Sequence, residues 1–303
     1  MDSLPVDTHV VNKLTQNERR AYFQLHGCVI LWGFTAILGR IITLPAGELV
    51  AWRMACVTVL LATFHQTWKG LRVMRSRSII IYLGIGCIVA AHWLAFYSSI
   101  KMANASVAVA CLGLSSVFAA ILEPFITRRP HERYEILLGA LAIPGVVLIV
   151  GGVPIDFRLG IVIGVASAFL SSIFTTLNKR FAEADNAFTV TAIEMTAGAV
   201  LLGFPILVGN GFTTPTGEDL LWIIVLAAVC TLLPFVLWLH SLRNVSAFST
   251  LLILNLEPVY AILLAAFLFH EYEDLTLLFY LGTAIVLLTV ILQPRLRQLT
   301  PSS

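Results

Sequence analysis

The sequence predicts an all-α membrane protein with ten transmembrane helices arranged as two inverted five-helix repeats. Three observations lead to this fold class: the composition is strongly apolar, ten apolar stretches follow one another with short connectors, and the first five stretches resemble the last five. Because five is odd, two copies of such a unit enter a bilayer in opposite senses. This architecture is typical of secondary transporters, whose substrate site lies near the midplane between the repeats.

The composition places nearly all of the chain in a lipid bilayer. Of its 303 residues, 58% are hydrophobic and 12% charged, whereas a soluble domain carries about 25% charged residues. The net charge of +2 is too small to suggest nucleic-acid binding. All five cysteines lie inside apolar stretches without a CxxC pair, so we interpret them as small buried residues and expect no disulfide framework, metal site or cofactor.

Apolar runs near or above about 18 residues set the ten spans. They are residues 22–42, 48–67, 78–100, 104–127, 135–153, 159–178, 188–208, 220–241, 245–269 and 274–293. We assign 1–21 to a cytoplasmic N-terminal segment, 22–153 to the first repeat, 154–293 to the second and 294–303 to a cytoplasmic tail. No signal peptide with a small-residue cleavage site opens the chain, so we expect the run from Tyr22 to be retained.

The distribution of basic residues predicts the orientation. Of the 19 Lys and Arg residues, 15 flank the spans on one side and only Arg40, Lys101 and Arg158 flank them on the other; Arg53 lies within a span. The basic side faces the cytoplasm. Both termini are then cytoplasmic, which requires an even number of spans.

The internal repeat is clearest where the third span leads into the fourth. Residues Ser99–Leu114 align with Ser241–Leu256, with the Asn-x-Ser of Asn104 placed on that of Asn244. Each half continues into an Ala-Ile-Leu stretch and a charged turn, His-Glu-Arg in the first half and His-Glu-Tyr in the second.

These residues give the chain a resemblance to the drug/metabolite transporter superfamily, in particular its EamA-type branch with two five-helix repeats. The matching features are Ala51-Trp52-Arg53, the basic residue that precedes spans 4 and 9, the Glu257-Pro258-Val259-Tyr260 segment, and the two charged turns that stand for the family's Gly-Glu-Arg turn. The resemblance implies a central cavity lined by spans 1, 3, 4, 6, 8 and 9. It also implies a multi-pass protein of the bacterial inner (plasma) membrane that exports a small metabolite such as an amino acid.

Glu257 is the leading candidate for the substrate site. It lies near the middle of span 9, where an ionisable residue costs a few kcal/mol and is by default functional. Pro258 removes a backbone donor and frees a carbonyl there. Glu257 either binds a cationic group of the substrate or exchanges a proton; the alternative is that it bonds a neighbouring helix and fixes the kink. Asn255 and Tyr260 are expected to shape the pocket beside it.

Four other charged residues are candidates for structural or gating roles. Arg53 and Glu194 occupy similar places in spans 2 and 7, but their depths differ by roughly 13 Å. We therefore expect a separate partner for each, with Arg53 extending toward the nearer, outer water. Glu123 is expected to pair with Arg128 or Arg129 near the surface. Lys101 is the remaining cation near the membrane interior.

Several uncharged polar and aromatic residues extend the predicted pocket. His92 and Trp93 in span 3 either form a recognition surface or are interior packing groups. Ser116 lies on a stripe of small residues in span 4, which permits close packing or lines a polar path. Thr175 and Asn178 lie on a polar row of span 6, and Trp238 lies on a stripe of span 8 that is either substrate-contacting or core.

The sequence predicts a secondary active transporter rather than an enzyme. It contains no HExxH, no GxSG and no phosphate-binding loop, so we expect no catalytic residue, no metal and no ATP-driven pumping. The expected partners are a small-molecule substrate, the lipid bilayer and protons as a coupling ion. One alternative is an antiporter or facilitator of phosphorylated or nucleotide-linked metabolites, and another is an intramembrane enzyme. The oligomeric state cannot be inferred.

Overall fold

A computed structural model of the protein describes residues 15–182, 184–209, 211–254, 256–270 and 275–299. Within these ranges every regular element is a helix, which confirms the all-α class. The helices are α1 (Gln16–Ile41), α2 (Ala46–Ala62), α3 (His65–Val73), α4 (Ser76–Met102), α5 (Ala105–Leu112), α6 (Ser115–Thr127), α7 (Arg133–Gly151), η1 (Ile155–Phe157), α8 (Arg158–Phe181), α9 (Ala187–Val208), α10 (Gly217–Ala227), η2 (Ala228–Leu232), α11 (Leu233–Leu242), α12 (Ala247–Leu254), α13 (Glu257–Phe269) and α14 (Leu277–Leu299).

Helices occupy all ten ranges predicted as spans. Six are long and apolar enough to cross a membrane, and a seventh is obtained if α2 and α3 are counted as one broken span. These counts refer to the described residues and rest on length and composition alone. The total of ten spans therefore stays a prediction.

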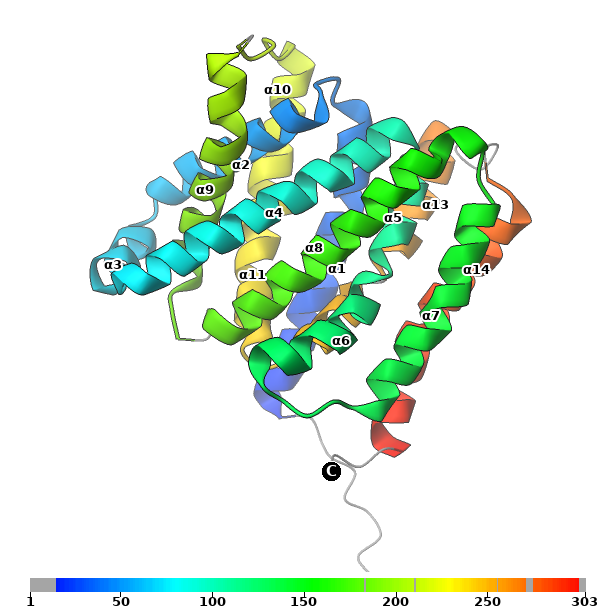
Figure 1. The fold of residues 1–303 in the computed structure, drawn as a ribbon. Helices are drawn as coiled ribbons and strands as arrows, with labels where there is room; N and C mark the ends of the chain where they lie inside the picture. Colours follow the sequence, from blue (N-terminus) through cyan, green and yellow to red (C-terminus); the bar gives the residue numbers. More distant parts are fainter. Residues whose placement is uncertain (1–14, 183, 210, 255, 271–274, 300–303) are drawn as a thin grey trace, which may run out of the picture.

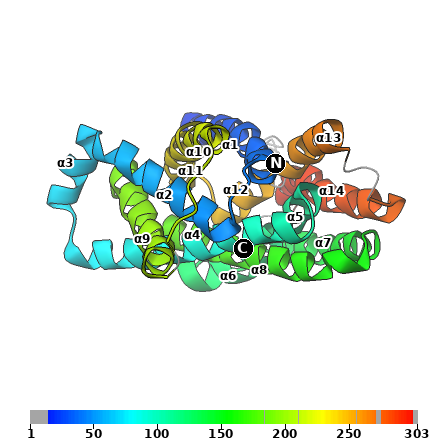
Figure 2. The ribbon, with the colours of Figure 1, turned by 90° about the horizontal axis from the view of Figure 1, so that it is seen from above.

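The second predicted span extends too far at its C-terminal end. The helix α2 stops at Ala62 rather than at residue 67, and α3 turns away from it by 86°. The apolar run ends at Phe64, and the following His65, Gln66 and Lys69 favour water over lipid. The short helix α3 therefore lies to one side of the bundle (Figures 1 and 2).

The fourth and ninth spans are both broken, and they are broken alike. The short helices α5 and α12 each contain 8 residues, and α6 and α13 each contain 13. The helix α12 starts 142 positions after α5, at residue 247 against 105, and α13 starts 142 positions after α6, at residue 257 against 115. Both second pieces end in a residue with left-handed backbone, Arg128 at φ 59° and His270 at φ 56°. The duplication thus extends to the position of each helix break.

This register corrects one detail of the predicted repeat. With a separation of 142 positions the counterpart of Asn104 is Ser246, not Asn244. Both residues precede a helix and accept a hydrogen bond from a backbone N–H three residues on, at 2.8 Å for Val107 and 3.0 Å for Ser249. Asn and Ser are both strong N-capping residues. The capping function recurs although the residue type does not.

The packing of the helices repeats as well. Counterparts from the two halves pack against each other: α2 against α9, α7 against α14, and α5 and α6 against α13 and α12. The contact of α1 with α11 corresponds to that of α8 with α4. Exchanging the halves therefore maps these helix pairs onto one another, as expected for two units related by a two-fold axis.

The two halves run in opposite directions. The helix α1 begins at the lower end of Figure 1, whereas its counterpart α8 begins at the upper end. The start of α1 and the end of α14 lie at the same, lower end. Large apolar side chains cover the outside of the bundle, among them Phe23, Phe125 and Phe267 at 69–82% exposure. Such a surface fits a lipid environment.

Candidate functional site

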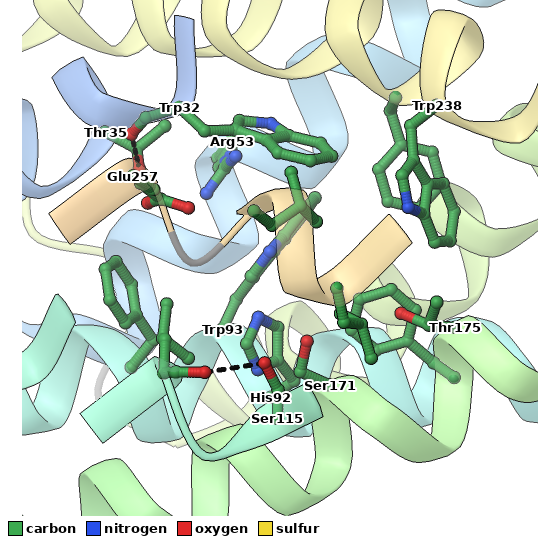
Figure 3. A pocket seen from close by; sticks show the side chains of 16 residues that line it. Trp32, Thr35, Arg53, His92, Trp93, Ser115, Ser171, Thr175, Trp238 and Glu257 are labelled. Atoms are coloured by element: carbon green, nitrogen blue, oxygen red, sulfur yellow. Dashed lines mark hydrogen bonds between the residues drawn. The ribbon is translucent and has the colours of Figure 1, made fainter. Parts of the chain in front are cut away.

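A pocket lies in the interior where the breaks of α5/α6 and α12/α13 meet (Figure 3). Both repeats contribute to it, through α1, α2, α4, α5, α6, α8, α11, α12 and α13. These helices cover the six predicted wall spans and add α2, whose only contribution is Arg53. The lining side chains are Trp32, Thr35, Arg53, His92, Trp93, Phe96, Leu112, Ser115, Ser171, Phe174, Thr175, Phe235, Trp238, Leu251, Leu254 and Glu257.

Arg53 is held inside the bundle, which corrects the expectation that it extends toward the outer water. It is 2% exposed, and its guanidinium lies 3.8 Å from the ring centroid of Trp93. Its Nε donates to Thr231 Oγ1 at 2.6 Å and its Nη1 to the Tyr97 hydroxyl at 2.9 Å. The indole face of Trp93 and the two hydroxyl acceptors stabilise the buried guanidinium in place of the water that would otherwise solvate it.

A π-helical segment places the Thr231 hydroxyl. The segment η2 widens the helix just before Pro234, which lacks the N–H that a regular turn requires. Thr231 Oγ1 donates to the Leu226 carbonyl, five residues back, at 2.5 Å. Its lone pairs then face Arg53. The proline of span 8 thus fixes an acceptor in the pocket wall.

Glu257 lies opposite Arg53 in the same pocket (Figure 3). It is the first residue of α13, so its carboxyl is at the N-terminus of a half-helix, where the helix dipole favours negative charge. Its side chain is 7% exposed. Arg53 and Glu257 interact electrostatically across the pocket without forming a close ion pair. The site therefore places a guanidinium group and a carboxyl group opposite each other.

His92 is fixed by Ser167 of α8. Its Nδ1 lies 2.9 Å from the Ser167 carbonyl oxygen, and because a carbonyl only accepts, Nδ1 carries the hydrogen. The Ser167 hydroxyl donates to the His92 carbonyl at 3.1 Å. Nε2 then keeps a lone pair. The reciprocal pair joins α4 to α8 and orients the imidazole at the pocket wall.

Aromatic rings form most of the remaining wall. Phe174 lies 5.6 Å from Trp238 between ring centroids, and Phe235 lies 4.9 Å from Trp238. Trp238 Nε1 and Thr175 Oγ1 are buried without a hydrogen-bond partner in the described structure, so both are available to a bound molecule. Trp32, Phe96, Phe174 and Phe235 had no polar signal in the sequence. Their place in the pocket follows only from the packing of four separate helices.

Comparisons with known proteins agree with this arrangement. The EamA-like transporter family matches the chain twice, over residues 19–151 and 158–293. The protein belongs to this family. An uncharacterized transporter of Archaeoglobus fulgidus (strain ATCC 49558 / DSM 4304 / JCM 9628 / NBRC 100126 / VC-16) is 25% identical over 206 residues, which are 65% of this chain and 68% of the relative. A solved structure titled only "Crystal structure of protein" has a TM-score of 0.67 at 16% identity and covers 92% of this chain and 98% of that one, which shows a shared fold.

Four other candidate residues of this EamA-like transporter do not line the pocket, and a fifth cannot be placed. Tyr260 is 43% exposed, and its Cβ faces Gly33 of α1. Ser116 is buried beside the lining residue Ser115. Asn178 lies one turn beyond Thr175, toward the end of α8. Lys101 is exposed and donates to the Ile42 carbonyl at 2.5 Å. Asn255 lies outside the described residues.

Glu123 connects the two repeats of the transporter. The predicted pairing occurs with Arg129, at 3.0 Å, and Arg129 also binds Glu135 at 2.6 Å. The two carboxylate oxygens of Glu123 also accept from the backbone N–H groups of Ala247 and Phe248, at 2.8 and 2.7 Å. A carboxylate of α6 therefore caps α12 of the other half, which the sequence did not indicate.

Glu194 has no part in the pocket. It is fully buried in α9, and the partners of Arg53 are Thr231 and Tyr97 instead. Neither carboxylate oxygen of Glu194 has a hydrogen-bond partner in the described structure.

Proposed function

We propose that the protein is a secondary active transporter that moves a small, amino-acid-like metabolite by alternating access. The observation that carries the proposal is the pocket at the meeting point of two broken helices, one from each repeat. Helix pieces that end at such a pocket can move with their own repeat, so the pocket opens to either side in turn. Two repeats of inverted topology are common among transporters that work in this way.

The charge pattern of the pocket supports a zwitterionic substrate. Arg53 and the N-terminus of α6 at Ser115 attract a carboxylate, while Glu257 attracts an ammonium group. The unpartnered Trp238 Nε1 and Thr175 Oγ1 supply further hydrogen bonds. The rings of Trp93 and Phe174 offer apolar contact for a side chain. His92 contributes an acceptor at Nε2.

Export is the direction that the family resemblance implies, with both termini cytoplasmic in a bacterial inner membrane. Labelling of single cysteines tests the topology, because Arg75→Cys and Asp156→Cys change exposed residues on opposite flanks of the spans. A membrane-impermeant maleimide applied to intact cells is expected to label Asp156→Cys and not Arg75→Cys. The reverse result rejects the assigned orientation, and labelling of both rejects the count of spans between them.

Two other functions fit the site less well. A phosphorylated or nucleotide-linked metabolite needs a surplus of positive charge, whereas the single cation of the pocket lining, Arg53, faces the carboxyl of Glu257. An intramembrane enzyme needs a nucleophile beside a base, whereas the Ser115 hydroxyl donates to the Leu112 carbonyl at 2.6 Å and His92 is bound to Ser167. Counterflow of labelled substrate and product analysis separate these functions from the proposed one.

The decisive experiment is amino-acid exchange by the purified full chain in proteoliposomes. Vesicles loaded with an unlabelled amino-acid mixture are expected to accumulate the labelled mixture by counterflow. Glu257→Gln removes the carboxylate and keeps its shape, so we expect exchange to fall by at least about tenfold, equivalent to about 1.4 kcal/mol of lost binding. Glu218→Gln, an exposed acid of α10, is the matched control and is expected to exchange like the wild type.

Two outcomes would reject the proposal. If the wild type exchanges no amino acid while sugar phosphates exchange, the substrate class is wrong. If Glu257→Gln exchanges as fast as the wild type, the carboxylate does not bind the ammonium group.

A further inference from the structure

Glu194 is the one buried carboxyl of the described chain that is left without a stabilising partner. Glu123 and Glu135 are paired with Arg129, and Asp219 accepts two hydrogen bonds from Thr43. Glu257 faces Arg53. Glu194 is 0% exposed, and both its oxygens lack a partner.

The surroundings of Glu194 are polar, and no cation of the described residues contacts its carboxyl. The cation on this side is Arg243 at the end of α11, which donates to the Asp185 carbonyl and interacts electrostatically with Tyr82. Asn178 of α8 lies beside its carboxyl, although no atom pair between them has hydrogen-bond geometry, and both polar atoms of the Asn178 amide are also unpartnered. On α4, Tyr82 is close enough to interact electrostatically with Glu194. The other helices that pack against α9 are α2, α3 and α11. On α2, Arg53 is bound in the pocket and Cys56 carries a thiol. On α11, His240 contacts the Val236 carbonyl, and on α3 both His65 and Lys69 are exposed.

Neighbouring helices pack closely against the part of α9 that carries Glu194. A side chain at Gly86 of α4 would lie 2.3 Å from the Glu194 carbonyl oxygen, so the two backbones are in contact there. One turn further along α9, a side chain at Gly198 would meet Met54 of α2 and Ala90 of α4. An ionised carboxylate enclosed in this way has no counter-charge and loses several kcal/mol of hydration. One added proton removes the charge without needing more space.

Polar groups lead from Glu194 in both directions. Toward one end, the Tyr82 hydroxyl lies 2.6 Å from Asp185 Oδ2, in the half-buried connection between α8 and α9. Toward the pocket, Asn178 is followed one turn back on α8 by Thr175, which lines the pocket. The series Asp185, Tyr82, Glu194, Asn178, Thr175 lies between the end of the bundle that carries most basic residues and the substrate pocket. Asp185 and Tyr82 are hydrogen-bonded, and the polar atoms of Glu194, Asn178 and Thr175 have no partner in the described structure.

We infer that Glu194 is a proton-binding site, separate from the substrate pocket, through which a proton gradient is coupled to transport. The site takes up a proton from water at the Asp185 end and, when the bundle rearranges, releases it through the pocket. No covalent bond other than the O–H bond forms or breaks. The inference rests on the proposed function for the coupling, whereas the proton site itself stands on the geometry of Glu194 alone.

The coupling is tested in proteoliposomes containing labelled amino-acid mixture, with and without an imposed pH gradient. The gradient is expected to accelerate wild-type transport several-fold, and Glu194→Gln is expected to lose this acceleration while counterflow without a gradient continues. Tyr82→Phe, which removes the hydroxyl of the path, is expected to reduce the acceleration and to leave counterflow unchanged. Glu218→Gln is the control. If Glu194→Gln is accelerated as much as the wild type, the inference is overturned and the proposed function stands.

A second measurement needs no substrate. Infrared difference spectra of the purified chain between acidic and alkaline buffer are expected to contain a carboxylic-acid C=O band that is absent in Glu194→Gln and shifted in Asn178→Ala. If no amino acid moves but this band is found, the proton site is supported and the proposed function fails. If the same band persists in Glu194→Gln, the proton site is rejected whether or not transport is observed.

Discussion

The contact between Glu123 and the start of α12 gives the most direct test of how the two repeats are held together. Glu123→Gln keeps one oxygen acceptor, but it removes the negative charge shared by two backbone N–H groups and Arg129. Hydrogen bonds to charged groups contribute about 1.5–3 kcal/mol each, and breaking a buried ion pair costs about 3–5 kcal/mol. Because Arg129 keeps Glu135, we expect the lower part of that range, about 3 kcal/mol of lost stability.

The assay is thermal unfolding of the purified full chain in detergent, followed by tryptophan fluorescence. At roughly 2–4 °C per kcal/mol for a protein of this size class, the midpoint is expected to fall by roughly 6–12 °C. Glu132→Gln, a half-buried neighbour at the start of α7, is the matched control and is expected to stay at the wild-type midpoint. An unchanged midpoint for Glu123→Gln would refute the idea that this carboxylate joins the repeats.

Three further substitutions test other parts of the framework by the same assay. Thr231→Val leaves the Arg53 Nε without its 2.6 Å acceptor and is expected to lower the free energy of unfolding by about 1–3 kcal/mol. Thr231→Ser keeps the hydroxyl and is expected to keep much of the stability. Equal unfolding midpoints for the two variants would show that Arg53 does not depend on this hydroxyl. Gly86→Ala places a methyl group 2.3 Å from a backbone oxygen of α9 and is expected to destabilise the protein by about 1–3 kcal/mol. Gly84→Ala on the same helix meets nothing within 4 Å and is expected to be neutral or stabilising. A higher unfolding midpoint for Gly86→Ala than for Gly84→Ala would contradict the packing of α4 on α9. Asp219→Asn weakens the hydrogen bonds of 2.8 and 2.7 Å from Thr43 and is expected to lower the unfolding midpoint. The neighbouring control Glu218→Gln is expected to leave the midpoint unchanged. Equal midpoints for the two variants would mean that the contact between Asp219 and Thr43 adds no stability.

The order and location of the helices could be predicted from the sequence because they depend on local properties. Apolar run length and basic flanks placed a helix in every predicted range, and the repeat was visible around Ser99 and Ser241. The predicted alignment of Ser99–Leu114 with Ser241–Leu256 already has the observed separation of 142 positions, and only the pairing of Asn104 with Asn244 was wrong, because it matched residue types. The structure repeats the capping role instead, and Asn and Ser serve that role about equally.

The contents of the pocket were only partly predictable. His92, Trp93, Thr175, Trp238 and Glu257 were proposed for the pocket from their polarity or aromatic character at bilayer depth, whereas Arg53 was proposed only as a structural or gating charge. The structure brings all six together. Trp32, Phe96 and Phe235 carried no such signal, since an aromatic residue in an apolar run is equally suited to lipid, core or pocket. The inward course of Arg53 depends on Thr231, which lies far along the chain and is aimed by a π-helical segment that spacing did not predict.

The cap on α12 also has a consequence for direction. The position that corresponds to Glu123 in the second repeat, 142 residues later, is Ala265, and alanine has no carboxylate to cap the start of α5. Two units with the same path of the chain therefore differ in this contact: the start of α12 is capped by a carboxylate of the first repeat, and the equivalent position of the second repeat carries no acid. Under the alternating access proposed above, a contact that is present in only one half would give the two facing states unequal free energies. That difference would lie in the contact between the repeats and not among the residues that line the pocket.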